Sequence, residues 1–161
     1  MGISKEVINV VLPMKTFDTS KMDTWTDEQW RQFVGDEKEY EGIQLLLMDD
    51  SNFYLKITGV HFNETTEEMV FSFDTKNKTG EKVYIQFGQW QIDESIYNLT
   101  ADRPLYLDKV SGVRSFQKRV QRSYLKEWDK TIMEMKILDA ESNIVTRELE
   151  FQMIKQYTLL F

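Results

Sequence analysis

The stretch from residue 53 to residue 92 constrains the fold more than any other part of the chain, because apolar and polar residues alternate through three successive runs. Residues two apart share one face of a β-strand, so this spacing predicts three strands, each with one apolar face. The sequence Asn-Lys-Thr-Gly at residues 77–80 separates the second run from the third and predicts a hairpin. The stretch therefore predicts an antiparallel β-meander around one core face.

Two glycines interrupt the alternation within this stretch. The apolar positions change parity after Gly59, to Val60 and Phe62, and again after Gly88, to Trp90. One extra residue in a strand moves every later side chain to the opposite face, so we predict a β-bulge at each glycine. Strands that bend in this way can take part in both sheets of a sandwich.

Length and composition are those of one globular domain. The 161 residues are 41% hydrophobic, so we expect a single domain over residues 1–161. The chain has no cysteine, which excludes disulfides, thiolate metal sites and cysteine nucleophiles. No apolar run approaches the ~20 residues of a membrane span, and no signal peptide is apparent. We expect a soluble protein without membrane insertion, cytoplasmic as the chain stands, or at the cell surface if a signal or anchor precedes it.

The residues before the meander predict a strand, a helix and a second strand. Residues 6–12 alternate like a strand that ends at Pro13. Thr26 and Gln29 have the spacing of a capping box, so a helix is expected over about Asp27–Val34. Residues 43–48 form a nearly continuous apolar run, followed by a turn at residues 49–52. Residues 1–52 are therefore predicted to be an extension packed on the core.

The residues after the meander predict a turn over 93–98 and four further strands, near residues 105–107, 133–137, 149–153 and 157–161. Residues 115–130 leave two alternatives. An apolar residue at every fourth position from Phe116 to Trp128 is typical of a helix, whereas a strand over 113–118 with a second short helix near 119–130 suits the neighbouring strands. The total of about eight strands with one short N-terminal helix predicts a mainly β fold, an antiparallel two-sheet β-sandwich.

The order of the motifs resembles a known group of domains. An Ile-x-Gly-Val strand start at residues 57–60 is followed by Met-Val-Phe-Ser-Phe, the Asn-Lys-Thr-Gly turn, Val-Tyr-Ile-Gln-Phe, and a late pair of strands at residues 132–138 and 148–154. This order is similar to that of the immunoglobulin-like domains of unknown function in Gram-positive bacterial proteins, over residues 53–154. The resemblance implies an immunoglobulin-like β-sandwich of bacterial origin. Those relatives are typically exported or lipid-anchored, whereas this chain lacks the lipobox cysteine.

The charge of the chain indicates a protein partner better than a nucleic acid. The net charge is −7, and direct binding to nucleic acid needs a clustered basic surface. Two local clusters are candidates for contacts with an unidentified protein partner. The candidates are the acids Asp36, Glu37, Glu39 and Glu41 and the bases Arg114, Lys118, Arg119, Arg122 and Lys126.

The sequence offers few residues for catalysis or cofactor binding. His61 is the single histidine, so we interpret it as a surface or hydrogen-bonded residue. The acidic pairs at residues 49–50 and 93–94 lack the spacing of an EF-hand or of a glycosidase and are interpreted as turns. The tryptophans are core candidates first, although they could line a sugar platform. We predict no catalytic residue, no metal site and no cofactor.

Three functions remain as hypotheses. The first is a non-catalytic protein-interaction or accessory module, which is not an enzyme. An alternative is an acidic inhibitor, encoded by a phage or a bacterium, whose carboxylates occupy a basic groove of a nucleic-acid enzyme. A further alternative is a carbohydrate-binding module that uses Trp90 and neighbouring aromatic residues.

Overall fold

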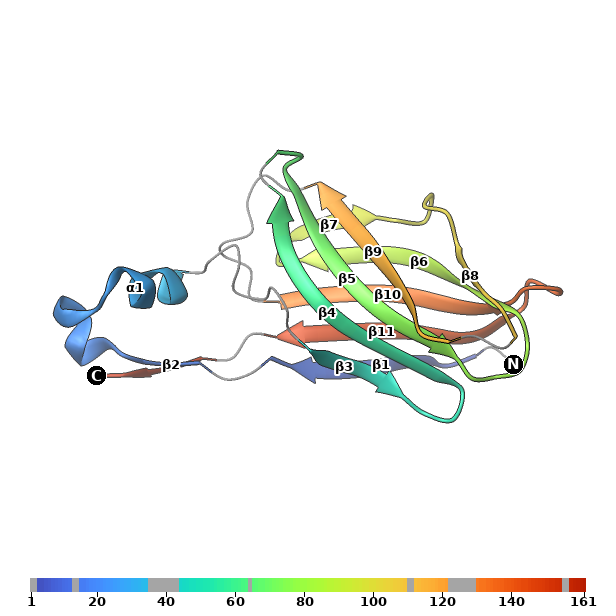
Figure 1. Ribbon diagram of the computed structural model, residues 1–161, viewed down its shortest axis with the longest axis horizontal. Coiled ribbons are helices and arrows are strands. Elements are labelled where there is room, and N and C mark those ends of the chain that lie inside the picture. Colours follow the sequence, from blue (N-terminus) through green and yellow to red (C-terminus); the bar gives the residue numbers. More distant parts are fainter. Residues whose placement is uncertain are drawn as a thin grey trace.

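The chain is mainly β. The structure, a computed structural model, describes residues 3–12, 15–34, 44–63, 65–109, 112–121, 130–154 and 157–161. Within these ranges it contains twelve strands, one 3-10 helix and one α-helix (Figure 1). The mainly β prediction is confirmed, although the number of strands exceeds the expected eight.

The larger sheet contains six strands around β10. Neighbouring strands in this sheet run antiparallel, except that β1 runs parallel to β11. The order is β1 (Lys5–Val11), β11 (Val145–Ile154), β10 (Lys130–Asp139), β6 (Val83–Ile92) and β7 (Ser95–Asn98), and β8 (Leu105–Leu107) also pairs with β6.

The second sheet is fully antiparallel and stacks on the larger one, as Figure 1 shows. Its order is β3 (Leu45–Asp49), β4 (Phe53–Asn63), β5 (Glu68–Asn77) and β9 (Arg114–Gln121). Side chains from the inner faces of both sheets form one apolar core. We call these two sheets the main body.

The predicted meander is correct for its first two strands and wrong for the third. β4 pairs with β5, but β6 belongs to the other sheet, so residues 77–80 cross between sheets and form no hairpin. Buried Asn77 fixes this crossing, because its Nδ2 donates to the carbonyl oxygens of Glu81 and Asp108 at 2.7 and 3.1 Å. Alternation identifies the buried face of a strand but not the strand beside it.

Both predicted bulges are confirmed by shifts in strand register. Between β4 and β5 the register shifts after Ile57, at Gly59. Between β6 and β10, Phe87 and Trp90 pair with successive inward residues of β10, so Gly88 and Gln89 oppose a single residue. Each strand stays within one sheet, and the bulge returns the later apolar side chains to the same core.

Trp90 occupies the centre of this core. Its ring centroid lies 5.2 Å from Phe71 and 6.0 Å from Phe73, both with edge-on geometry. Phe87, on its own strand, lies 6.5 Å away. The side chain is fully buried, and its Nε1 has no hydrogen-bond partner. Trp90 therefore joins β5 and β6 across the two sheets.

The N-terminal helix forms where the sequence predicts it, as α1 (Asp27–Val34). The capping box is present, because the Thr26 amide donates to Gln29 Oε1 at 2.8 Å and the Gln29 amide donates to Thr26 Oγ1 at 3.3 Å. Trp25 and Trp30 pack edge to face with centroids 4.9 Å apart. The predicted capping box therefore marks the start of the helix in the structure.

A second group of elements, which we call the ribbon unit, lies beside one end of the main body (Figure 1). It contains β2 (Lys15–Asp18), the 3-10 helix η1 (Thr19–Thr24), α1 and β12 (Tyr157–Leu160). β2 and β12 form a parallel two-stranded sheet. Residues 1–52 are therefore divided, since β1 and β3 lie in the main body while β2, η1 and α1 lie in the ribbon unit.

Two local predictions need correction or addition. Ser95–Asn98, predicted to be part of a turn, is the short strand β7 on the edge of β6. Arg114–Gln121 is a strand, which decides residues 115–121 against the helical alternative. Of the rest of the helix predicted near residues 119–130, residues 122–129 lie outside the described residues, and Lys130 is the first residue of β10.

Candidate functional site

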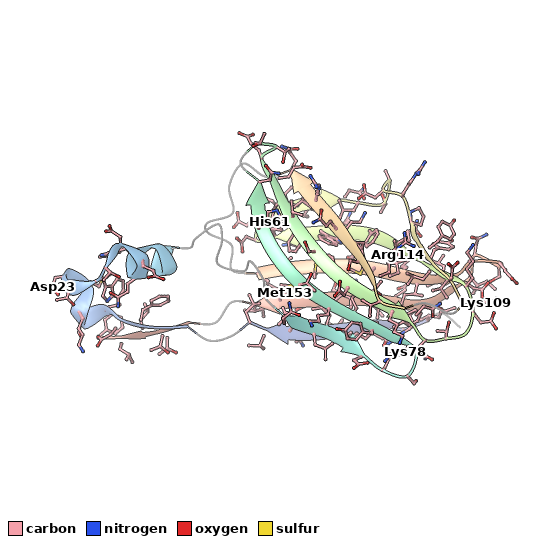
Figure 2. All side chains as sticks on the ribbon, in the orientation of Figure 1. Asp23, His61, Lys78, Lys109, Arg114 and Met153 are labelled. Atoms are coloured by element: carbon pink, nitrogen blue, oxygen red, sulfur yellow. The ribbon has the colours of Figure 1, made fainter. Side chains whose placement is uncertain are left out.

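Three basic partner-binding candidates lie on β9, at one edge of the second sheet. Arg114 begins the strand (Figure 2), and Lys118 and Arg119 follow it. Successive side chains of a strand point to opposite faces, so Lys118 shares a face with buried Val120 while Arg119 lies on the other face. The structure therefore divides these candidates between two faces.

Lys118 turns toward the core at this edge. Its side chain is 11% exposed, and its Nζ lies 2.8 Å from Oδ2 of Asp102 and 3.9 Å from the centroid of the Phe87 ring. An ion pair and an aromatic face both stabilise the ammonium group here. An inward-pointing charge on an edge strand also discourages pairing with a further strand. Lys118 thus has a structural role.

The other two β9 candidates also have local acceptors. Nη1 of Arg114 donates to the backbone carbonyl oxygen of Tyr106. Nη1 of Arg119 lies 3.5 Å from Oε1 of Glu68. Lys118 and Arg119 therefore each lie beside an acid, whereas Arg114 donates to a neutral carbonyl oxygen.

Lys118→Met is expected to lower the free energy of unfolding by about 1 kcal/mol, because the ion pair and the cation–π contact are both lost. Arg119→Met removes the same charge from the exposed face of the same strand and is expected to change it by less than about 0.5 kcal/mol. Urea unfolding of both variants measures the difference. Equal effects would show that Lys118 does not stabilise the edge.

The remaining partner-binding candidates lie outside the described residues, so the structure does not bear on them. They are Asp36, Glu37, Glu39, Glu41, Arg122 and Lys126.

An open groove of about 410 Å³ lies on the outer face of the larger sheet. Pockets that bind ligands typically measure ~300–1,000 Å³, so this groove has the size of a binding site. Its lining comes from β1, β6, β10 and β11, together with Thr100 after β7. The polar side chains in it are Lys5, Gln86, Gln89, Thr100, Glu134, Lys136 and Glu148.

Charges of both signs alternate along the groove. Lys136 lies opposite Glu148 on the neighbouring strand, with Nζ and Oε1 3.9 Å apart. Glu134 lies opposite Glu150, and such a like-charged pair is unfavourable unless a cation joins it. Lys5 supplies that cation, since its Nζ is 3.0 Å from Oε1 of Glu150 and 3.6 Å from Oε1 of Glu134.

This arrangement shifts the acid–base equilibria of two groove-side groups. The hydrogen bond to Glu150 raises the pKa of Lys5, and the two carboxylates near it act in the same direction. Hydrogen bonds from Gln152 and then Lys5 lower the pKa of Glu150. Both groups are therefore held in their charged forms at neutral pH.

Gly88 keeps the groove open. A Cβ atom at this position would lie 3.0 Å from Cβ of Glu134 and 3.2 Å from its Oε2. The bulge brings the β6 backbone this close to β10, so any larger residue would crowd the groove. Sequence reasoning predicted the bulge but missed the groove. The polar residues Glu134 and Lys136, which alternate with the apolar residues from Met133 to Ile137, are the sequence signal for this outward face.

A salt-bridge network joins the two sheets near the start of β1. Arg147 on β11 donates to both carboxylate oxygens of Glu6, at 2.8 and 2.6 Å, and to Oδ2 of Asp50 at 2.8 Å. These hydrogen bonds lower the pKa of Glu6. Burial tends to raise the pKa of Asp50, but hydrogen bonds from the amides of Asn52 and Phe53 and from Arg147 outweigh burial and lower it. Glu6 and Arg147 are the strand neighbours of the groove residues Lys5 and Glu148, so the network lies on the opposite face of the larger sheet from the groove.

The other residues that the sequence offers for catalysis or binding lie in turns, on a strand or in the core. Asp50 and Asp93 lie in turns, where Asp50 accepts two backbone hydrogen bonds and Asp93 has a φ of 52°. His61 is a half-buried residue on β4 (Figure 2). Trp90 is fully buried and cannot stack on a sugar. The described residues contain no group of three or more acidic or histidine side chains placed to hold a metal ion.

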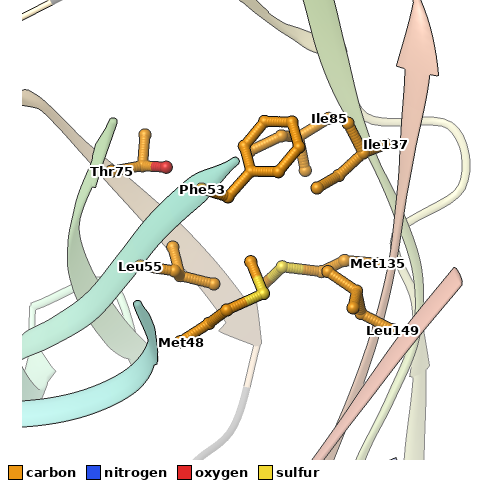
Figure 3. Close-up of a pocket in the computed structure, with 8 residues that line it drawn as sticks. All are labelled: Met48, Phe53, Leu55, Thr75, Ile85, Met135, Ile137 and Leu149. Carbon is orange, nitrogen blue, oxygen red and sulfur yellow. The ribbon is translucent and has the colours of Figure 1, made fainter. Parts of the chain in front are cut away.

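A second cavity lies inside the core, between the two sheets, and is shown in Figure 3. Its volume is about 10 Å³. Roughly 10–15 Å³ is needed for one water molecule, so this cavity is too small for an organic ligand. Its lining residues are Met48, Phe53, Leu55, Thr75, Ile85, Met135, Ile137 and Leu149.

Comparison with known proteins does not assign the chain to a family. No family model matches it, and no curated protein matches it. One solved structure with local similarity is a β-glucosidase from Kluyveromyces marxianus, with 12% sequence identity and a TM-score of 0.29. The match covers 66% of this chain and 15% of the enzyme. In the described part of this chain, no helix is both long and apolar enough to span a membrane.

Proposed function

We propose that the chain is a non-catalytic interaction module with an immunoglobulin-like β-sandwich, and that it binds a protein partner through the groove on the outer face of the larger sheet. The groove is the observation that carries this proposal. It presents charged side chains of both signs, two glutamine amides and a threonine hydroxyl on one exposed sheet face.

The strand order supports the immunoglobulin-like part of the proposal. Immunoglobulin domains place strands A, B and E in one sheet and C, F and G in the other. The order β4-β5-β9 matches A-B-E, and the order β6-β10-β11 matches C-F-G, with β7 in the place of C′. A buried tryptophan on strand C is a hallmark of those domains, and Trp90 lies on β6.

The chemistry of the groove supports a protein as the ligand. A peptide segment carries charged side chains and backbone amides, and each has a complement among the lysines, glutamates and glutamines here. Neutral sugars are usually held by stacking on exposed aromatic rings, and Trp90 is buried. The acidic-inhibitor alternative depends on Asp36, Glu37, Glu39 and Glu41, which lie outside the described residues.

Reversing one charge in the groove tests the proposal. Lys136→Glu is expected to reduce capture of a specific protein from native cells by at least about tenfold, which corresponds to 1.4 kcal/mol of binding free energy. Lys56→Glu is the matched control, because Lys56 also lies opposite an acid, Asp74, but on the other sheet. Quantitative affinity capture with the wild type and both variants gives the comparison.

The expected result is loss of the protein with Lys136→Glu and retention with Lys56→Glu. Equal capture by the three baits would contradict binding through the groove. If the wild type bound to a glycan array and captured no specific protein, the proposal of a protein partner would be contradicted.

A further inference from the structure

β1 forms one edge of the larger sheet, and among the described strands it pairs with β11 on one side only (Figure 1). The backbone N–H and C=O groups of successive residues point to alternate sides of a strand. The amide of Leu12 donates to the carbonyl oxygen of Ile154 on β11 at 3.3 Å, so the even-numbered residues of β1 bond to β11. The backbone groups of Val7, Asn9 and Val11 therefore face away from the sheet.

β1 lacks the protection against strand addition that the other described edges of the main body have. Edge strands in soluble proteins are usually short, bulged or marked by an inward-pointing charge. β7 and β8 have four and three residues, and β9 has the inward-turned Lys118. β3, and β4 at the point where β3 ends, carry register shifts that mark bulges. β1 pairs with β11 over seven residues in unbroken register, and Val7–Val11 contains no charge and no proline.

The side chains along this edge would also gain cover from an added strand. Val7 and Val11 are 51% and 54% exposed on the outer face, and Ile154, which lies opposite Val11, is 40% exposed. Ile8 and Val10 turn inward and pack at the margin of the core. Residues that lie opposite one another in paired strands share a face. A segment with aliphatic side chains on both faces therefore fits beside Val7–Val11.

The groove indicates which protein supplies this segment. Lys5, the first residue of β1, lines the groove, so a protein held in the groove lies directly beside this edge. A strand added to β1 extends the same sheet whose outer face carries the groove. A second copy of the chain is disfavoured, because each copy has a net charge of −7 and the two repel one another.

We infer that β1 binds an extended, uncharged segment of the protein that occupies the groove, and that this segment joins the larger sheet as a further strand. The backbone groups of Val7, Asn9 and Val11 hold the segment by hydrogen bonds, and the exposed valines favour aliphatic side chains opposite them. The inference rests on the proposed function, since the groove supplies the partner, but it assigns a second contact surface and a mode of binding.

Photoreactive amino acids at positions 7 and 11 of the full chain test the inference, with position 89 in the groove as the reference. Irradiation is carried out in native cells, and mass spectrometry identifies the cross-linked residues of the partner. Asn9→Pro removes the outward N–H group between the two positions, and proline is tolerated on an edge strand where its missing N–H would face away from the neighbouring strand. Asn9→Ala keeps this N–H group and is the matched control. Urea unfolding of both variants compares their stability.

Positions 7 and 11 are expected to cross-link to one segment of the protein that position 89 also captures, at residues that are likewise four apart. Asn9→Pro is expected to lower both yields at least about tenfold, whereas Asn9→Ala leaves them unchanged.

The alternatives give different products. Cross-links from position 89 without any from positions 7 and 11, or from these two to unrelated parts of the partner, would overturn the added strand and leave the role of the groove intact. Cross-links from positions 7 and 11 to a second copy of the chain would overturn the partner segment as the occupant. Absence of a product at all three positions would contradict the proposed function as well.

Discussion

Trp90→Ala is expected to lower the free energy of unfolding by about 3–5 kcal/mol, the usual cost of removing a large aromatic side chain from a core. Trp90 is fully buried and packs on Phe71 and Phe73 of the facing sheet and on Phe87 of its own strand. Its removal leaves a cavity between the two sheets that neighbouring rings can fill only in part. Urea or thermal unfolding of the purified variant measures the loss.

Two further variants give this prediction its controls. Trp30→Ala removes the same ring from a side chain that is 39% exposed, and it should cost clearly less. Trp90→Phe keeps an aromatic ring and removes an Nε1–H group that has no acceptor, so it should cost less than Trp90→Ala. If Trp90→Ala and Trp30→Ala were equally stable, Trp90 would not be the central contact between the sheets.

Arg147→Met is expected to lower the free energy of unfolding at neutral pH by about 1–2 kcal/mol, an amount reduced by the partial exposure of the two carboxylates. The substitution leaves Glu6 and Asp50 without their shared cation while it preserves most of the side-chain volume near Phe53. Lys136→Met removes one charge from an exposed lysine and serves as the control. Its effect should stay below about 0.5 kcal/mol.

Arg147→Met is also expected to change how the free energy of unfolding depends on pH. A carboxylate whose pKa is lowered by folding adds stability that is present above its unfolded-state pKa and is lost as pH falls through its folded-state pKa. The pKa values of Glu6 and Asp50 are both lowered, so the wild type should lose stability as pH falls below about 4.5, the usual value for a glutamate. Arg147→Met should reduce this acid-dependent loss, mainly through Glu6. Parallel pH profiles of the wild type and Arg147→Met would contradict this role of the network.

The features that sequence patterns predicted are local ones. Alternation and parity changes identified β4, β5 and β6 and the bulges at Gly59 and Gly88. The capping box located α1. Each of these signals lies within a few residues along the chain, where backbone geometry and side-chain direction are directly coupled.

The features that were missed depend on contacts between distant segments. Nothing near Gly80 indicates that β6 pairs with β10, because the partner of a strand is decided by packing of the whole core. The groove joins Lys5, Gly88, Glu134 and Glu148 from four strands, so no single stretch contains its pattern. Proximity in the sequence groups Lys118 with Arg119, whereas strand parity places the two on opposite faces.

The proposed role of the groove is tested most directly by a photoreactive amino acid at position 89, with position 117 as the control. Gln89 lines the groove, and Gln117 is an exposed glutamine on β9 in the second sheet. Irradiation in native cells should cross-link a specific protein from position 89, not from position 117, and Lys136→Glu should abolish the product. Absence of any protein cross-link at position 89, or equal products from both positions, would contradict protein binding through the groove.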